Sequence, residues 1–216
     1  FLRWDFLEAL ESTGCATPER GWLPQHITLW RGEQLIAAAP AYIKLDSFGD
    51  FSRAWGWVEL LRRAGVHYYP KLVLCVPFSP VPGPRVLSAP GENRQEIIRH
   101  ICDAAIKFAE TQELNSVHFL FQSETEAQEF QEGNWHHRTL FQFHWHNQGW
   151  KSFQEWLGSF TSKRRNQLKR EQSMAAKQGI TLRTIGQEVL ATDPQGWAEK
   201  TYALYATNCQ KFSWGA

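Results

Sequence analysis

Tyr69 and Lys71 stand just before the apolar run "LVLCV" (72–76). Transfer of an acyl group to an amine needs a neutral amine, a polarised carbonyl and a protonated leaving group. A tyrosine hydroxyl can donate a proton to the leaving oxygen or sulfur, and a lysine can orient a negative group. The structural alternative is that Tyr69, which precedes Pro70, packs with its hydroxyl in water. These residue types make Tyr69 a candidate catalytic residue and Lys71 a candidate substrate-binding residue.

A proline-rich link, "PFSPVPGPR" (77–85), follows this run directly. Its prolines hold the chain extended, and Gly83 is free to turn. Ligands of open α/β sheets bind at the carboxyl ends of strands, and a rigid rim loses little entropy on binding. Arg85 has paired donors for a phosphate or carboxylate. We therefore expect Phe78, Gly83 and Arg85 to bind substrate; the alternative is a stiff surface loop with a solvated Arg85.

Two histidines, His144 and His146, alternate with aromatic residues in "QFHWHN" (142–147). On a strand they would share one face, and the ordinary pKa of histidine suits His144 to the role of general base. The alternative is a structural His144, held by Gln142 or Asn147. No third ligand is spaced to complete a metal site, so no metal is expected.

The segment "KRRNQLKR" (163–170) holds five of the 23 Lys and Arg residues and none of the 22 Asp and Glu residues. Lys163, Arg164 and Arg165 are candidate substrate-binding residues, because clustered cations suit tRNA or a diphosphate-linked cell-wall precursor. The alternatives are a solvated helix face or a face that packs on a second domain.

Hydrophobic periodicity predicts the elements that must position these residues. The predicted order is helix, hairpin, core strand, helix, core strand, helix and strand, at 1–12, 25–45, 71–78, 93–112, 116–121, 124–132 and 137–147. This alternation predicts an α/β fold with a mixed sheet and helices on both faces.

A second domain is predicted to begin near the end of the chain. We divide the chain into a first domain (1–150), a connector with the basic helix (151–179), and the start of a second domain (180–216). A fresh strand at 180–185 and a fresh helix at 196–209 support the last of these. A single strand and helix cannot form a core alone.

Composition limits the compartment and the partners. No apolar run reaches the roughly 20 residues that span a bilayer, and the apolar face of the basic helix is too thin for stable membrane insertion. The four cysteines form no CxxC motif, which fits a reducing environment, and the first residues do not read as a secretory leader. We expect a cytoplasmic protein.

Three motifs carry a family resemblance: "YYPKLVLCVPFSPVPGPRVL" (68–87), "QFHWHN", and "SKRRNQLKREQSMAAKQGI" (162–180). They look like the FemAB-like predicted N-acyltransferases of the peptidoglycan biosynthesis group, which are similar to Fem aminoacyltransferases. The resemblance implies a GNAT-like acyl-CoA N-acyltransferase fold, with a second tandem GNAT-like domain beginning in the last residues. It also implies that strands 71–78 and 116–121 are parallel neighbours that splay apart, with the acyl chain of the donor in the gap.

The donor predicted from this resemblance is not restricted to coenzyme A. No glycine-rich pyrophosphate loop follows the core strand, and proline stands where amide donors would be needed. We therefore expect no bound cofactor, with acyl-CoA or aminoacyl-tRNA as co-substrate. The expected acceptor is a small molecule or a cell-wall precursor; tRNA is a candidate partner and DNA is not.

Two functions follow from these observations. The first is an N-acyltransferase that moves an activated acyl or aminoacyl group onto an amine, with an anionic donor carrier or acceptor. The second is a non-catalytic GNAT-like module that holds RNA or another polyanion through the 163–170 helix. The second predicts polyanion affinity that falls steeply with salt, and no turnover.

Overall fold

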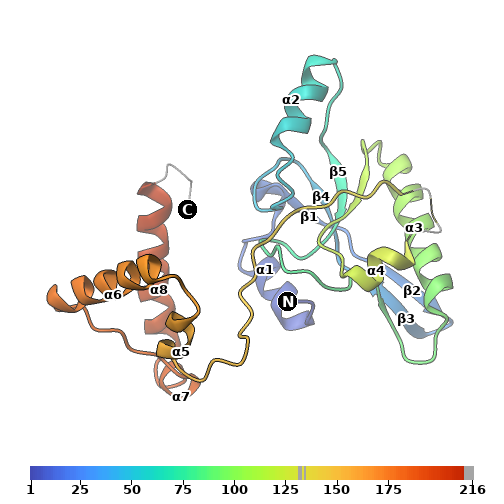
Figure 1. The fold of residues 1–216 in the computed structure, drawn as a ribbon. Coiled ribbons are helices and arrows are strands. Elements are labelled where there is room, and N and C mark those ends of the chain that lie inside the picture. Colours follow the sequence, from blue (N-terminus) through green and yellow to red (C-terminus); the bar gives the residue numbers. More distant parts are fainter. Residues whose placement is uncertain (131–132, 134, 212–216) are drawn as a thin grey trace. The chain divides into compact units, whose positions relative to one another are not determined.

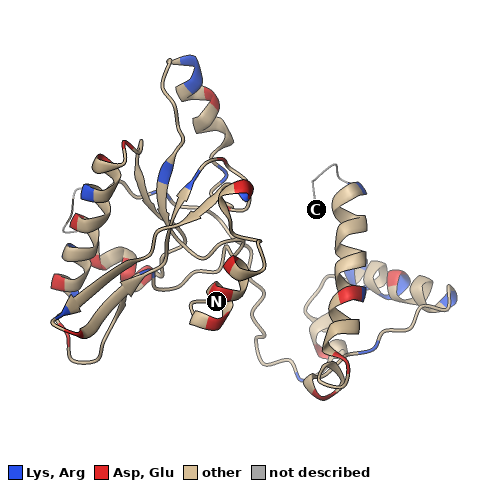
Figure 2. Cartoon of the chain, turned by 180° about the vertical axis from the view of Figure 1, so that it is seen from behind, with Lys and Arg blue, Asp and Glu red and all other residues tan. Residues whose placement is uncertain are grey.

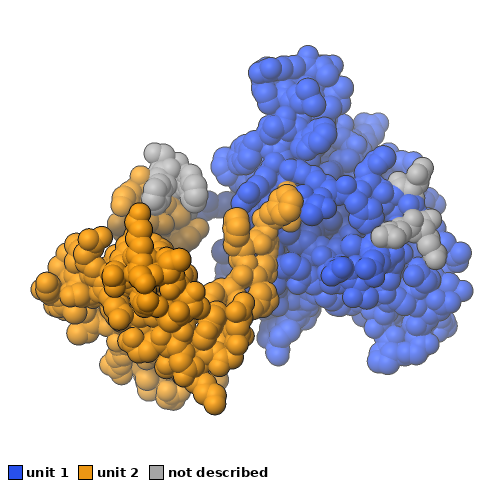
Figure 3. Space-filling model, viewed as in Figure 1, with its two compact units in different colours: residues 1–139 blue, residues 140–216 orange. Residues whose placement is uncertain are grey.

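The computed structural model describes residues 1–130, 133 and 135–211. The chain forms two compact units, residues 1–139 and 140–216, which Figure 3 colours separately and which are described here one at a time. The division falls at 139/140, whereas the sequence placed it at 150.

Unit 1 contains the mixed sheet expected from the sequence. Its strands are β1 (Trp22–Pro24), β4 (Ala41–Lys44), β5 (Lys71–Leu74) and β7 (Val117–Phe119), in the order β1-β4-β5-β7. The first three pair antiparallel, whereas β5 and β7 pair parallel with Leu72 opposite Val117 and Leu74 opposite Phe119. The prediction that the two core strands are parallel neighbours is confirmed.

A second, smaller sheet consists of β2 (Ile27–Arg31), β3 (Gln34–Ala39) and β6 (Leu87–Ser88). The chain passes from this sheet to the first at Pro40, between β3 and β4. Proline cannot donate a ladder hydrogen bond, so it suits this break. Its carbonyl accepts from Cys75 N at 3.2 Å, which joins the crossing point to the end of β5.

One face of the β1-β4-β5-β7 sheet packs on α3 (Arg94–Thr111), as Figure 1 shows. Side chains alternate across a strand, so Ile43, Leu72 and Leu74 point to this face. They form one core with the apolar stripe of α3: Ile97, Ile98, Ile101, Cys102 and Ala105. The side chain of Asn93 caps the start of the helix by accepting hydrogen bonds from the backbone amides of Gln95 and Glu96.

The opposite face carries Trp22, Tyr42, Val73 and Cys75, with Leu10 from α1 (Trp4–Ser12) packed against them. The short 3₁₀ helix η1 (Pro18–Arg20) leads into β1. This face is smaller in apolar content than the α3 face, and two lysines share it. The two buried lysines of the sheet, Lys44 and Lys71, therefore lie on the face opposite α3.

Helix α2 (Trp55–Arg63) projects from the rest of unit 1 (Figure 1) and has no buried residue. Helix α4 (Glu124–Glu129) follows β7 and is capped by Ser123.

Two strand predictions are wrong. Residues 137–147 and 180–185 form neither helix nor strand. Phe141 is 85% exposed and Phe143 fully exposed, so the alternating pattern has no buried face to sit on. A strand without a ladder partner leaves its backbone groups to water and is not stable alone.

The described part of unit 2 is helical, with α5 (Phe153–Gly158), α6 (Ser162–Lys177), α7 (Gln187–Leu190) and α8 (Pro194–Lys211). The basic helix is confirmed as α6. The second GNAT-like domain stays a prediction. Among the described residues, no helix combines the length and the apolar character required to cross a bilayer.

Candidate functional site

Strands β5 and β7 part at the start of the proline-rich link. Their last shared bond is Leu120 N to Leu74 O, at 3.1 Å. Beyond it β7 turns to the link instead: Gly83 N donates to Phe121 O at 3.0 Å, and Gly83 O accepts from Ser123 N at 3.0 Å. The two strands are thus hydrogen-bonded to each other as far as Leu74 and are no longer paired beyond it.

Arg85, at the end of the link, lies beside this parting and is 1% exposed. Its guanidinium donates to Leu120 O at 2.6 Å, Val81 O at 2.7 Å, Phe121 O at 2.9 Å and Pro84 O at 3.0 Å. Burial lowers its pKa. This corrects the expectation that Arg85 binds an anionic substrate: carbonyls of the link and of the two residues that follow β7 use four of its five N–H donors.

Glu126 of α4 fixes the link from the other side. Its carboxylate is 2% exposed and accepts from Arg85 N at 2.7 Å, Val86 N at 2.9 Å and Arg94 Nη2 at 2.8 Å. One buried carboxylate therefore holds together the end of the link, α4 and the first turn of α3. Sequence reasoning missed it, because a glutamate in a polar helix looks solvated.

Gly83 and Phe78 lie on the rim of the link. Gly83 forms a bridge with Gln122 and has no positive φ, so the freedom to turn expected of it is not used. Phe78 has φ 57° and is 42% exposed, and its ring lies 5.5 Å from that of Trp22. Its backbone N–H donates to Gly49 O at 3.1 Å.

Lys71, the first residue of β5, has no exposed surface. Its Nζ lies 3.4 Å from Asp50 Oδ2 and faces the rings of Tyr68 and Tyr69, at 4.6 and 5.1 Å from their centroids. Burial lowers the pKa of Lys71, and the Asp50 charge opposes the shift. The residue lies at the predicted site, but it contacts a buried aspartate rather than solvent.

Tyr69 is half-buried, with its hydroxyl 2.6 Å from Ser47 Oγ. Its ring meets that of Tyr68 edge-on. Burial raises the pKa of Tyr69, so the phenol stays protonated at neutral pH. A protonated phenol is the form that can donate to a leaving group.

Lys44, the last residue of β4, is the cross-strand partner of Lys71 and is also fully buried. Its Nζ lies 2.6 Å from Asp46 Oδ1 and 4.6 Å from the centre of the Trp22 ring. Gly21 allows this pair to sit against the backbone: its φ is 76°, and a Cβ there would collide with Asp46.

His118 of β7 shares the face of Lys71 and lies opposite Val73. Its Nε2 is 2.8 Å from Ser116 Oγ. Burial, with the nearby Lys71 charge, lowers the pKa of His118 to about 4, so the imidazole is neutral at pH 7. The sequence analysis did not select it, since one histidine in an apolar strand gives no spacing pattern.

His144, the predicted base, lies in the exposed irregular segment of unit 2, stacked on His146 with ring centroids 6.1 Å apart. Its side chain is exposed, so no buried surroundings orient it as a base. Within the described residues, no group of three or more His, Cys, Asp or Glu is arranged to hold a metal ion.

The basic residues of α6 are mostly exposed, and Figure 2 shows them in blue along the helix. Lys163 and Arg164 extend into solvent, whereas Arg165 is half-buried and donates to Phe160 O and Ser162 Oγ, both at 3.3 Å. The helix has no side-chain cap at its start. Cations in the first turn of a helix are repelled by the positive end of the helix dipole, so a bound anion would be stabilised there.

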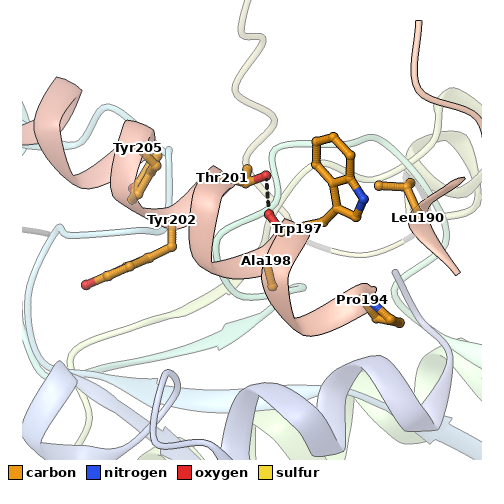
Figure 4. A pocket seen from close by; sticks show the side chains of 7 residues that line it. All are labelled: Leu190, Pro194, Trp197, Ala198, Thr201, Tyr202 and Tyr205. Atoms are coloured by element: carbon orange, nitrogen blue, oxygen red, sulfur yellow. Dashed lines mark hydrogen bonds between the residues drawn. The ribbon is translucent and has the colours of Figure 1, made fainter. Parts of the chain in front are cut away.

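Unit 2 also has an open groove of about 580 Å³ between α7 and α8 (Figure 4). Its lining is Leu190, Pro194, Trp197, Ala198, Thr201, Tyr202 and Tyr205. Thr201 Oγ1 donates to Trp197 O at 2.8 Å. The lining is mainly apolar and aromatic, with the hydroxyls of Thr201, Tyr202 and Tyr205 as its polar side-chain groups and the indole N–H of Trp197 beside them.

Comparison with known proteins gives one match. The whole chain, residues 1–216, fits the model of the FemAB-like family, whose description is peptidoglycan biosynthesis/recognition. No curated protein and no solved structure matches the chain. Because the match covers every residue, the chain belongs to the FemAB-like family of peptidoglycan biosynthesis and recognition proteins.

Proposed function

We propose that the chain is part of an N-acyltransferase that moves an activated acyl or aminoacyl group onto an amine of a cell-wall precursor or similar acceptor. The observation that carries the proposal is the parting of two parallel neighbours, β5 and β7, beyond Leu74. Ligands of open sheets bind where strands end and diverge. Family membership supports the peptidoglycan context.

The position of Arg85 changes how a donor would bind. Its buried guanidinium donates to the carbonyls of Leu120 and Phe121, just beyond β7, where the resemblance places the start of the gap for an acyl chain. The proposal therefore seats the transferred group on the rim, against Phe78 and Gly83, rather than between β5 and β7. Both acyl-CoA and aminoacyl-tRNA remain proposed donors, because neither is selected by a glycine-rich phosphate loop.

Tyr69 is the proposed proton donor to the leaving group. Its hydroxyl is protonated and contacts Ser47, so it is held in one orientation. The proposal assigns Lys163 and Arg164 of α6 to an anionic acceptor or carrier, and no role to His144.

A second candidate is a polyanion-binding module. It is favoured by one observation, the exposed row of basic side chains on α6. This reading predicts RNA affinity that falls with salt and is lost when Lys163 and Arg164 are both replaced by Gln.

The experiment that tests the proposal is mass spectrometry of candidate amine acceptors after incubation with the protein and either acyl-CoA or aminoacyl-tRNA. Acyl transfer predicts a mass gain equal to the transferred group. Tyr69→Phe removes the proposed acid and should reduce turnover by at least about tenfold, while leaving the fold intact. A protein that binds RNA and transfers nothing from either donor is the outcome expected of the second candidate.

A further inference from the structure

The side of the β4–β5 pair that faces away from α3 contains a set of buried donors, which we call the lysine basin: Lys44, Lys71, Trp22, Tyr68 and Tyr69. Lys44 and Lys71 are directly opposite each other in the antiparallel register, and neither has exposed surface. Facing residues of such a pair have Cβ atoms about 5 Å apart. Two lysines are therefore buried on neighbouring strands, at facing positions.

Every acceptor that balances these charges comes from one short segment, the capping loop (residues 46–53). Asp46 meets Lys44, Ser47 meets the Tyr69 hydroxyl, and Asp50 meets Lys71. The sheet thus supplies the cations and the capping loop supplies the anions. Without the capping loop, the basin would contain two adjacent positive charges and no counter-charge.

The fit between the capping loop and the basin is incomplete. Asp50 is 4% exposed, yet its Oδ2 has no hydrogen-bond partner, because its 3.4 Å approach to Lys71 lacks hydrogen-bond geometry. Lys71 Nζ also donates to Tyr68 Oη, at a long 3.5 Å. The buried indole of Trp22, over which Lys44 lies, also has an Nε1–H donor without a partner. Buried polar groups normally have hydrogen-bond partners, so the two unpartnered atoms, Asp50 Oδ2 and Trp22 Nε1, require an explanation.

Little apolar contact holds the capping loop in place. Phe48 is 68% exposed and Phe51 is 49% exposed. Phe51 and Arg53 both adopt φ 51°, a left-handed conformation that is unfavourable for side chains with a Cβ. The three polar contacts with the basin are thus a part of what holds the capping loop, beside the bonds from Phe78 N to Gly49 O at 3.1 Å and from Arg138 to Arg53 O at 3.2 Å, and an incoming anion would replace these three.

From this arrangement we propose that the lysine basin binds a phosphate group of a ligand, and that Asp46 and Asp50 occupy the place of that group in the ligand-free chain. A phosphate dianion matches two lysines in charge. Its oxygens can accept from both ammonium groups, from the Trp22 indole and from the tyrosine hydroxyls. A carboxylate brings one charge and fewer acceptor sites.

A purely structural role explains the basin less well. Buried ion pairs rarely stabilise a fold more than apolar residues of the same shape, since both charges must be desolvated. The basin shares Tyr69 with the acyl-transfer proposal, but the inference concerns binding alone and is tested without turnover, so the two can fail separately.

The test is hydrogen–deuterium exchange of the full chain, with and without inorganic phosphate. The amides of Phe48 and Ser52 donate to the carboxylates of Asp46 and Asp50, so displacement of these carboxylates should speed their exchange about tenfold or more. The effect should saturate with phosphate concentration and give its dissociation constant. Acetate at the same concentration should have little effect.

Substitutions in the basin separate the proposal from a structural role. Asp50→Asn keeps the shape and both lysines but removes the competing charge, so phosphate should bind about tenfold more tightly. Lys71→Met should weaken phosphate binding by at least about tenfold. Lys107→Gln, which removes an exposed cation of α3, should leave the constant unchanged.

Three results would overturn the proposal. The first is exchange of residues 46–53 that phosphate does not alter. The second is weaker or unchanged phosphate binding in Asp50→Asn, which would mean that the aspartate supports the site instead of competing with the ligand. The third is an equal response to acetate, which would mean that the basin does not select a dianion. Should Lys71→Met fail to fold, the wild-type and Asp50→Asn measurements still decide the question.

Discussion

Replacement of Glu126 by Ala is expected to destabilise unit 1 by about 3–5 kcal/mol. The carboxylate is the acceptor for two buried backbone amides, those of Arg85 and Val86, and for the Arg94 guanidinium. An unsatisfied buried donor costs about 1–3 kcal/mol, and a charged partner more. The Arg94 side chain is partly exposed, so water can replace part of the interaction that it loses. The expected loss of stability therefore lies at the lower end of the sum of these costs.

The assay is urea denaturation of the full chain, followed by amide exchange of Leu72 and Leu74, which report the unit 1 core rather than unit 2. Glu124→Gln is the matched control, because Glu124 is exposed in the same helix; it should cost less than about 1 kcal/mol. A second readout is local: the Arg85 and Val86 amides should exchange faster in Glu126→Ala, at urea concentrations where the core is intact. A loss below about 1 kcal/mol would refute the account of this carboxylate as the anchor of the proline-rich link.

Three further predictions concern other parts of the site. Burial lowers the pKa of His118 from 6.5 to about 4. The folding free energy that depends on a neutral His118 is therefore fully present above pH 6.5 and is lost as the pH falls toward 4. His118→Gln should remove about 3 kcal/mol of pH dependence from urea titrations in that window, and an unchanged profile would contradict the burial. Gly21→Ala should cost at least about 1–2 kcal/mol, because φ is 76° and the new Cβ would displace Asp46; a thermal melt at the wild-type temperature would contradict this. Arg85→Lys should cost about 2 kcal/mol, because one ammonium cannot bridge the carbonyls that the guanidinium joins, whereas a residue that binds only external anions could be replaced without a change in melting temperature.

The two parallel strands and the main helix could be predicted from the sequence. The continuous apolar run at 72–76 is typical of a strand buried on both faces, and β5 is buried throughout. The run at 116–121 was predicted as a second central strand; it forms the parallel neighbour β7, but at the edge of the sheet and only partly buried. The apolar stripe of α3 follows the helical period and its core residues are buried. These elements could be predicted because the burial of a single strand or helix face follows from the spacing of apolar residues along a short stretch of sequence.

The chemistry of the polar face could not be predicted in the same way. Lys44 is the last residue of β4 and Lys71 is the first residue of β5. A lysine at the end of an apolar strand is normally expected to reach solvent. Their burial depends on Asp46 and Asp50, which lie in an irregular segment whose path is set by tertiary contacts. Arg85 shows the same limit: its sequence context suggests a free anion-binding side chain, and only the carbonyls gathered by β7 and the link reveal its structural use.

The strand predicted at 137–147 fails for a different reason. Alternation indicates a strand only when a neighbouring strand and a core are available. The exposed Phe141 and Phe143 show that this segment has neither in the described chain. His144 was selected on the strength of that strand, so its assignment as a base lost its support with it.

The measurement that tests the account most directly is mass-spectrometric detection of acyl or aminoacyl transfer to an amine-bearing peptidoglycan precursor, with wild-type protein and Tyr69→Phe compared side by side. The account predicts a time-dependent mass gain with acyl-CoA or aminoacyl-tRNA, and a rate at least about tenfold lower in the variant. Equal product formation by the two proteins would contradict the role of Tyr69. Binding of donor and acceptor without any mass gain in the wild type would contradict the transferase itself.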